Sequence, residues 1–568
     1  MSRVRPFATL VAFFTLSFQS TILVNAQRSA LDTFAITNAK IVTVSGSVIE
    51  RGTVVIRDGL IAAVGEKVTA PADAKVIDGT GLTVYPGLFD SNTSLGTAAP
   101  TPAPAGGPGG FLQAQLRPAT TPAPSGPNST QQPGLQPELM AEDSIKPGGT
   151  EIEAARNVGI TTALTAPRTG IWIGQSALIN LAGDTPQQMI VKSPVAMHVG
   201  FQRTGGAGGY PGSLMGVFAS LRQMLLDAQR YKTALEIYER APRGTRRPDL
   251  DRSLAALIPV LDGKMPVVMT ANSQREIERA LDLAQEFKLH AMIAGGAEAA
   301  TVADRLRELD VPVLLSLNFP RRTTTAAPEA EPDSLRTLRA RVEAQKAPGK
   351  LAAARVRFAF QSGSLASMSD YLANAVKAIE NGLSREEALR ALTIRAAEIF
   401  GVADRLGSIE TGKIANLTIT RGDIFDRNTR VTNLFIDGRS VDLRPAPAAP
   451  AAGSGAGPRT AGAPAEEARV NFAGTWNISI SVSGQALPAT LVFREEGGAL
   501  SGSLQTQIAT ADFTGGTMVG SAFHMVVSAI IQGQPVELTI DGTVQGDQIN
   551  GTVQSAFGPA TFTGSRQP

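Results

Sequence analysis

The stretch Tyr85 to Gly96, which reads YPGLFDSNTSLG, decides the fold of this 568-residue chain. It opens with Pro-Gly and the apolar Leu88, and it continues into polar side chains at Asp90, Asn92 and Ser94. A short apolar run after a turn signal is typical of a buried strand. The pattern therefore predicts a strand whose last residues carry polar groups.

The segments on either side of this strand differ in character. Residues 32–85 read as short strands rich in β-branched residues, and Asp58-Gly59 between two of them favours a hairpin turn. Residues 97–137 are rich in Pro, Ala, Gly, Thr and Gln, a composition that buries too little apolar surface to offset ordering. We expect a flexible insertion there, and a mobile segment without function is favoured over a lid.

From about residue 140 to 400, apolar strands alternate with amphipathic helices. This rhythm predicts parallel strands with crossover helices, and hence an α/β fold. The spacing of Leu, Met and Tyr from Ser213 to Ala241 predicts a further helix, whose apolar stripe packs in the core. The other predicted helices are 151–158, 274–287 and 299–309, and the predicted strands are 265–269, 291–294 and 311–317.

Two motifs in the expected order resemble the metal-dependent amidohydrolase superfamily. Its first barrel strand reads P-G-[LF]-[IV]-D-x-H-x-H, which this chain matches at Pro86, Gly87, Leu88 and Asp90, whereas Asn92 and Ser94 stand at the histidine positions. The segments GLSREEALRALT (382–393) and RLGSIETGK (405–413) are similar to its last barrel helix and closing turn. The resemblance covers residues 32–443, and ARNVGITTALTAP and GQSALINLAG look most like the imidazolonepropionase-related branch.

This resemblance implies a (β/α)8 TIM-like barrel at 86–404 and a composite β-sandwich built from residues 32–85 and 405–443. It also implies zinc or another divalent metal, held by two histidines on the first strand, one each on the fifth and sixth, and an aspartate on the eighth. Here the first pair is replaced by Asn92 and Ser94, and the fifth-strand histidine by Thr270. Residues 293–298 contain no histidine, and the eighth-strand position falls on Gln361 and Ser362. We therefore predict that the metal ligands are absent and that the chain has no cofactor.

Few residues could take over the role of the missing ligands. The chain has three histidines, of which His524 lies in the C-terminal region and His290 lies between a predicted helix and strand. His198 is placed to face the barrel mouth, although packing in the core is the favoured role. Asp90 and Glu298 could provide oxygen ligands for a hard ion, but no motif supports such a site. A hydrogen bond at the strand end is the favoured role for Asp90.

The N-terminus carries the features of a secretory signal peptide. Arg3 and Arg5 precede an apolar run from Phe7 to Val24, and small residues precede a cleavage site after Ala26. The alternative is an uncleaved membrane anchor. Cleavage after residue 26 removes two arginines and no acids, so the formal charge falls from +2 to 0. We expect a periplasmic or secreted protein that binds neither nucleic acid nor, after signal removal, membranes. The absence of cysteine excludes disulfides and thiolate chemistry.

A second domain is expected at the C-terminus. Residues 444–469 form an Ala/Pro/Gly linker, and residues 470–568 read as many short strands with turn signals every 8–12 residues. This indicates an all-β barrel or sandwich. Its GTW opening and repeated glycine turns look similar to lipocalin-like β-domains.

These observations favour one hypothesis and leave two alternatives. By resemblance the chain is an exported hydrolase of non-peptide C–N bonds, but the replaced ligands favour a pseudoenzyme that binds a small-molecule ligand or a partner. One alternative is an active hydrolase with relocated metal ligands or a metal-free mechanism. The other is a structural subunit that associates with a second copy or with an active paralogue. Candidate site residues are Asp90, Asn92, Ser94, His198, Thr270, Glu298, Gln361 and Ser362.

Overall fold

The computed structural model describes most of the chain in two compact units. The first contains residues 32–97, 134–201, 211–320, 333–363, 365, 367–427 and 429–443; the second contains 472–567, with short gaps at 483–484, 497–498, 507–509, 520–521, 532–533 and 556–557. The predicted signal peptide at 1–26, most of the predicted insertion at 97–137 and the predicted linker at 444–469 lie outside the described residues.

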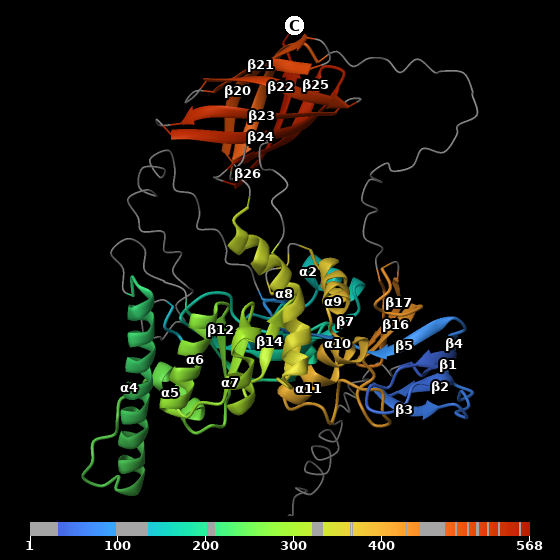
Figure 1. The fold of residues 1–568 in the computed structure, drawn as a ribbon, viewed down its shortest axis with the longest axis vertical. Helices are drawn as coiled ribbons and strands as arrows, with labels where there is room; N and C mark the ends of the chain where they lie inside the picture. The colour runs from blue at the N-terminus through green and yellow to red at the C-terminus, as the bar shows by residue number, and fades with distance from the viewer. Residues whose placement is uncertain are drawn as a thin grey trace, which may run out of the picture. The chain divides into compact units, whose positions relative to one another are not determined.

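One eight-stranded sheet combines strands from both flanks of the α/β region (Figure 1). Its order is β18-β17-β16-β5-β1-β2-β3, and β4 pairs with β1. Asp58 and Gly59 both have positive φ in the turn between β2 and β3, which confirms the predicted hairpin. The strands are β1 Phe34–Ile41, β2 Ile49–Arg57, β3 Leu60–Gly65, β4 Lys75–Asp78, β5 Leu82–Pro86, β16 Leu417–Arg421, β17 Val431–Ile436 and β18 Arg439–Val441.

The α/β region contains two further sheets, of order β10-β9-β7-β6 and β15-β14-β13-β12-β11-β8. Their strands are β6 Leu88–Thr93, β7 Ile160–Thr165, β8 Trp172–Gln175, β9 Ala177–Asn180, β10 Ile190–Lys192, β11 Met197–Gly200, β12 Val267–Ala271, β13 Ala291–Gly295, β14 Val313–Ser316 and β15 Phe358–Gln361. The strands β6 and β7 are parallel, and so are β11 to β15.

The two sheets meet on one side through Ser176, whose N–H donates to the Ala196 carbonyl and whose carbonyl accepts from Val195. The strands on either side of this joint, β8 and β9, are antiparallel to their neighbours β11 and β7. On the other side, no strand pairing between β6 and β15 is found within the described residues. The strand pairing therefore does not confirm the closed (β/α)8 barrel, although the fold is the expected mixture of parallel strands and covering helices.

The helices are η1 Ala141–Ser144, α2 Thr150–Asn157, α3 Pro186–Met189, α4 Leu214–Arg240, α5 Arg252–Leu261, α6 Gln274–Phe287, η2 Ala299–Val302, α7 Ala303–Glu308, α8 Leu335–Ala353, α9 Asp370–Glu380, α10 Arg385–Leu392 and α11 Ile394–Ile399. The helix α6 has the predicted bounds, and a capping box of Ser273 and Glu276 satisfies its first backbone N–H groups. Among the described helices, none is both long and apolar enough to span a membrane.

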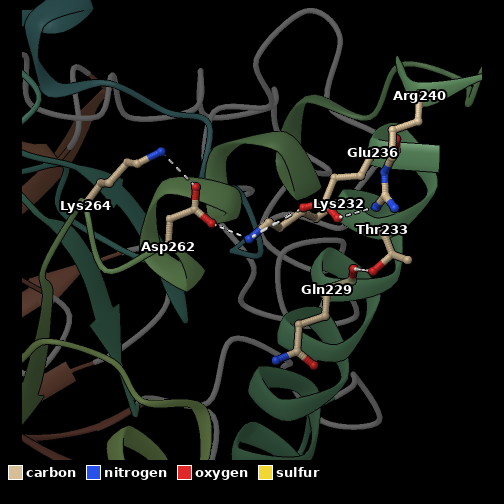
Figure 2. A network of polar contacts seen from close by, with 7 residues as sticks. All are labelled: Gln229, Lys232, Thr233, Glu236, Arg240, Asp262 and Lys264. Atoms are coloured by element: carbon tan, nitrogen blue, oxygen red, sulfur yellow. Dashed lines mark hydrogen bonds and ion pairs between the residues drawn. The ribbon is translucent and has the colours of Figure 1, made fainter. Parts of the chain in front are cut away.

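The long helix α4 is capped by Ser213, the first residue of the predicted helix, and one face of its N-terminal half is buried in the core. Its last twelve residues, 229–240, include no buried residue, and this part is fixed by charges (Figure 2). Lys232 forms an ion pair with Asp262, at the end of α5, and lies 3.9 Å from Glu236. Lys264 binds the other oxygen of Asp262 at 3.1 Å. Asp262 thus joins α4 to the loop after α5.

Five residues of the predicted flexible insertion, Thr97 and 134–137, are described, and all five are buried. Leu135 pairs with Trp172 and Met140 with Gln175, so this segment extends along the edge of β8. Residues 134–137 are therefore part of the fold and not of a flexible insertion as predicted, because a sheet edge is available for their backbone hydrogen bonds.

The second unit is a closed barrel of eight antiparallel strands, which agrees with the all-β prediction. Its strands are β19 Gly474–Val482, β20 Gln485–Glu496, β21 Ala499–Thr506, β22 Thr510–Val519, β23 Ala522–Ile531, β24 Gln534–Gln545, β25 Gln548–Ser555 and β26 Gly558–Arg566. Trp476 is fully buried, its indole N–H donates to the Phe472 carbonyl, and the Arg566 guanidinium lies 4.4 Å from its ring centre. The contact between Arg566 and Trp476 joins the last strand of the barrel, β26, to the first, β19.

Candidate functional site

Side chains of the parallel strands alternate between two apolar clusters. On β12, Val267 and Met269 belong to the large cluster that includes the covering helices, whereas Val268 belongs to a separate cluster. That second cluster, here called the inner cluster, also holds Phe89, Leu164, Met292, Ala294, Leu314 and Ala359 from five other strands. Since side chains two residues apart share a face, Thr270 and Gln361 continue the inner face toward the carboxyl ends of β12 and β15.

The structure brings two predicted site residues into direct contact. The Asn92 amide donates from Nδ2 to Oε1 of Gln361 at 2.8 Å, joining β6 to β15 across 269 residues of sequence. Gln361 in turn donates from Nε2 to the carbonyl of Leu314 on β14 at 2.5 Å. Gln361 is 2% exposed. The two side chains that replace expected metal ligands therefore bind one another.

The other two residues brought together are Asp90 and Ser362. Oδ1 of Asp90 accepts the Ser362 backbone N–H at 2.9 Å and, more weakly, that of Asn92 at 3.4 Å. The carboxyl group is fully buried, and its Oδ2 has no hydrogen-bond partner. Burial raises the pKa of Asp90 to about 6, against the opposing effect of the hydrogen bonds from Ser362. The predicted hydrogen bond at the strand end is thus present, but it reaches the last strand of the region.

Tyr371 on α9 is a member of this cluster that the sequence did not indicate. Its hydroxyl lies 2.7 Å from the carbonyl oxygen of Phe89 and 3.1 Å from that of Phe360, so it binds β6 and β15 simultaneously. Burial raises its pKa well above the ordinary value, and the nearby Asp90 adds to the effect. A tyrosine in an amphipathic helix reads as core packing, and the sequence carries no signal of this bridging role.

His198 lies on the inner face but away from the polar residues. It pairs with Val268 on β12. Its neighbours in sequence, Met197 and Val199, both belong to the large cluster that includes the covering helices. It is 2% exposed, its Nε2 has no hydrogen-bond partner, and burial lowers its pKa to about 3. These observations describe a neutral packed histidine at the level of the apolar inner cluster, rather than one at the strand ends.

The remaining predicted residues do not join the cluster. Ser94 follows β6 and accepts hydrogen bonds from Thr97 through its backbone carbonyl. Glu298 is exposed and caps α6, because its Oε2 accepts the Gln274 N–H at 2.7 Å. His290 is exposed between α6 and β13, at the amino ends of the strands, as predicted. Thr270, on the inner face of β12, makes no side-chain hydrogen bond to Asn92 or Gln361 among the described residues.

The side chains at the strand ends do not fit the metal that the resemblance implies. Zinc sites in proteins use histidine, cysteinate or carboxylate ligands, usually three or four together. Among the described residues, no three His, Asp or Glu side chains are grouped closely enough to hold a metal ion. The carboxyl group of Asp90 is turned to backbone N–H groups, and the neighbouring donors are neutral amides and hydroxyls. The absence of a bound metal from the purified protein remains a prediction.

Comparison with known proteins identifies the family. The model of the amidohydrolase family matches residues 150–441. A crystal structure of an amidohydrolase from Thermotoga maritima MSB8 is similar at 24% identity and a TM-score of 0.60, covering 72% of this chain and all of that one. No curated protein matches.

Two more distant structures show lower similarity. Phenylurea hydrolase B is 15% identical with a TM-score of 0.40, covering 72% of this chain and 97% of that one. A Xaa-Pro dipeptidase with bound methionine is 14% identical with a TM-score of 0.42, covering 72% of this chain and all of that one. The family model spans just over half of the sequence, and the motifs at both ends of the α/β region agree with it. The chain belongs to the amidohydrolase family.

Proposed function

We propose that this protein is an exported, catalytically degenerate member of the amidohydrolase family, which binds a small uncharged ligand at the carboxyl ends of β6 and β15. Its family chemistry is hydrolysis of non-peptide C–N bonds with a divalent metal. In the proposed function the fold is retained and metal-dependent hydrolysis is lost.

The hydrogen bond between Asn92 and Gln361 carries this proposal. A metal lowers the pKa of bound water from 15.7 to about 7, a difference of roughly 12 kcal/mol in the cost of forming hydroxide. That shift comes from the positive charge of the metal ion, which the neutral amides of Asn92 and Gln361 do not supply. His198 pairs with Val268 at the level of the apolar inner cluster, and within the described residues it belongs to no group of three His, Asp or Glu side chains that could hold a metal ion.

The chemistry of these residues also favours an uncharged ligand. Asn92 is partly exposed, and beyond its bond to Gln361 it retains a carbonyl oxygen able to accept a hydrogen bond. The only charged group in the cluster, Asp90, is fully buried and directed at backbone N–H groups. Because a buried charge without a counter-charge is costly, a carboxylate ligand would be disfavoured relative to an amide or a hydroxyl compound.

Metal analysis combined with activity measurements tests the proposal. Full chain purified without chelator should contain far less than one zinc, manganese or iron per molecule by plasma mass spectrometry. It should not hydrolyse amide, urea or carbamate substrates, and added zinc should not restore activity. One metal ion per chain, lost together with hydrolysis on chelation, would overturn the proposal.

Asp90 supports a second candidate, a metal-free hydrolase. An unpartnered Oδ2 and a pKa near neutrality are properties of acid–base groups. If hydrolysis is found that resists chelation, it should be lost in Asp90→Asn and retained in Glu298→Gln, whose side chain only caps α6. Loss in neither variant would exclude Asp90 as the acid–base group. Co-purification with a histidine-rich homologue would instead support the role of a partner subunit.

A further inference from the structure

The wall of parallel strands has an unusual joint between β6 and β15. Every other pair of adjacent parallel strands in the region is joined by a backbone ladder, and the opposite joint has backbone hydrogen bonds through Ser176. Between β6 and β15, no backbone-to-backbone hydrogen bond is found within the described residues. This gap is here called the seam.

Side-chain hydrogen bonds cross the seam at three positions along β6, which are residues 89, 90 and 92. The Tyr371 hydroxyl connects the carbonyls of Phe89 and Phe360. At the next position the Asp90 carboxyl accepts the Ser362 N–H. Two residues further the Asn92 amide binds Gln361. The three links therefore connect the end of β6, at residues 89 to 92, to residues 360 to 362 at the end of β15.

Four of the five crossing groups are protected from water, and Asn92 is partly exposed. Asp90 and Tyr371 are fully buried, and Gln361 and Ser362 are 2% and 6% exposed. Gln361 is held from its other side by the Leu314 carbonyl, which fixes its oxygen toward Asn92. A buried amide that loses its partner keeps the cost of desolvation, so the paired state is strongly preferred.

We infer that Asp90, Asn92, Gln361, Ser362 and Tyr371 form a clasp that holds β6 against β15 in place of a backbone ladder. The amide pair stands at the first-strand and last-strand positions where the family resemblance places metal ligands. The replacement residues thereby acquire a structural role of their own, which is to connect two strand ends that a shared metal ion would otherwise connect. The clasp acts whatever ligand the protein binds.

Hydrogen exchange of the full chain, measured peptide by peptide, tests the clasp. Asn92→Ala and Gln361→Ala should each raise exchange in peptides covering β6 and β15 by about tenfold, which corresponds to one ordinary hydrogen bond. Peptides covering β12 and β13 should be unchanged, because their ladder is independent of the seam.

A reciprocal exchange provides the matched control. Asn92→Gln with Gln361→Asn keeps the total length of the two side chains, so the double variant should return exchange at the seam to within about threefold of wild type. If an alanine variant does not fold, Tyr371→Phe removes only the hydroxyl and should show the same local pattern. Unchanged exchange at β6 and β15, an equal increase in β12 and β13, or no rescue by the reciprocal pair would overturn the inference.

Discussion

Replacing Asp90 with asparagine should make the protein less sensitive to pH between 4 and 7. The folded state raises the pKa of this carboxyl from 3.8 to about 6, chiefly through burial. The native protein therefore binds a proton more tightly than the unfolded chain does. Stability contributed by the protonated form is present below pH 3.8 and is lost as the pH rises through 6. Asparagine resembles the protonated acid and does not titrate.

The size of this change in stability follows from the shift in the pKa of Asp90. About two pKa units at roughly 1.4 kcal/mol each correspond to about 3 kcal/mol between pH 4 and pH 7.5. No discount for solvent screening applies, since the carboxyl group is fully buried. The free energy of unfolding of Asp90→Asn minus that of wild type should thus increase by about 3 kcal/mol as the pH rises over this range, so the variant gains stability relative to wild type. The contribution of other titrating groups cancels in the comparison.

Urea unfolding followed by tryptophan fluorescence measures this difference. The chain has two tryptophans, one in each unit, so a Trp476→Phe background leaves Trp172 to report on the α/β region. Asp78→Asn is a suitable control, because hydrogen bonds from Thr80 lower the pKa of Asp78 below 3.8, so this carboxyl titrates below the pH range of the experiment and its replacement should leave the stability difference nearly constant. A stability difference for Asp90→Asn that stays the same at both pH values would refute the reasoning.

Three further outcomes are expected. Burial lowers the pKa of His198 from 6.5 to about 3, so the wild type loses stability as the pH falls below 6.5. His198→Leu should therefore lose less stability on acidification, as measured by urea unfolding between about pH 6.5 and 4.5. Equal acid sensitivity of the two proteins would contradict the buried neutral state of His198. Asp262→Asn should accelerate hydrogen exchange in the last turns of α4 and leave its buried first half unchanged. A side chain at Gly502 would place its Cβ 1.8 Å from the Val492 carbonyl oxygen, so Gly502→Val should destabilise the C-terminal barrel by about 3 kcal/mol or more, seen as a lower urea midpoint for Trp476.

Local sequence signals predicted the helices well. The bounds of α6 follow from its Ser273 cap, its amphipathic spacing and the capping Glu276, all of which act within a few residues. The same holds for α4, whose Ser213 cap was readable in the chain. The antiparallel direction of β8 and β9 was not predicted, because a four-residue apolar run is compatible with either strand direction. Only the neighbouring strands select one.

The sequence by itself determined which side chains stand at the expected ligand positions. Residue identity is enough to show that Asn92, Thr270 and Gln361 are not histidines or carboxylates, and a motif at a strand end is enough to place them in the fold. The tertiary structure decided what these residues do instead. Asn92 and Gln361 are 269 residues apart, and Tyr371 reaches both strands from a helix, so their contacts depend on how the whole wall of strands is arranged. Hydrogen bonds require approach within about 3 Å, and only the folded chain sets such distances between remote segments.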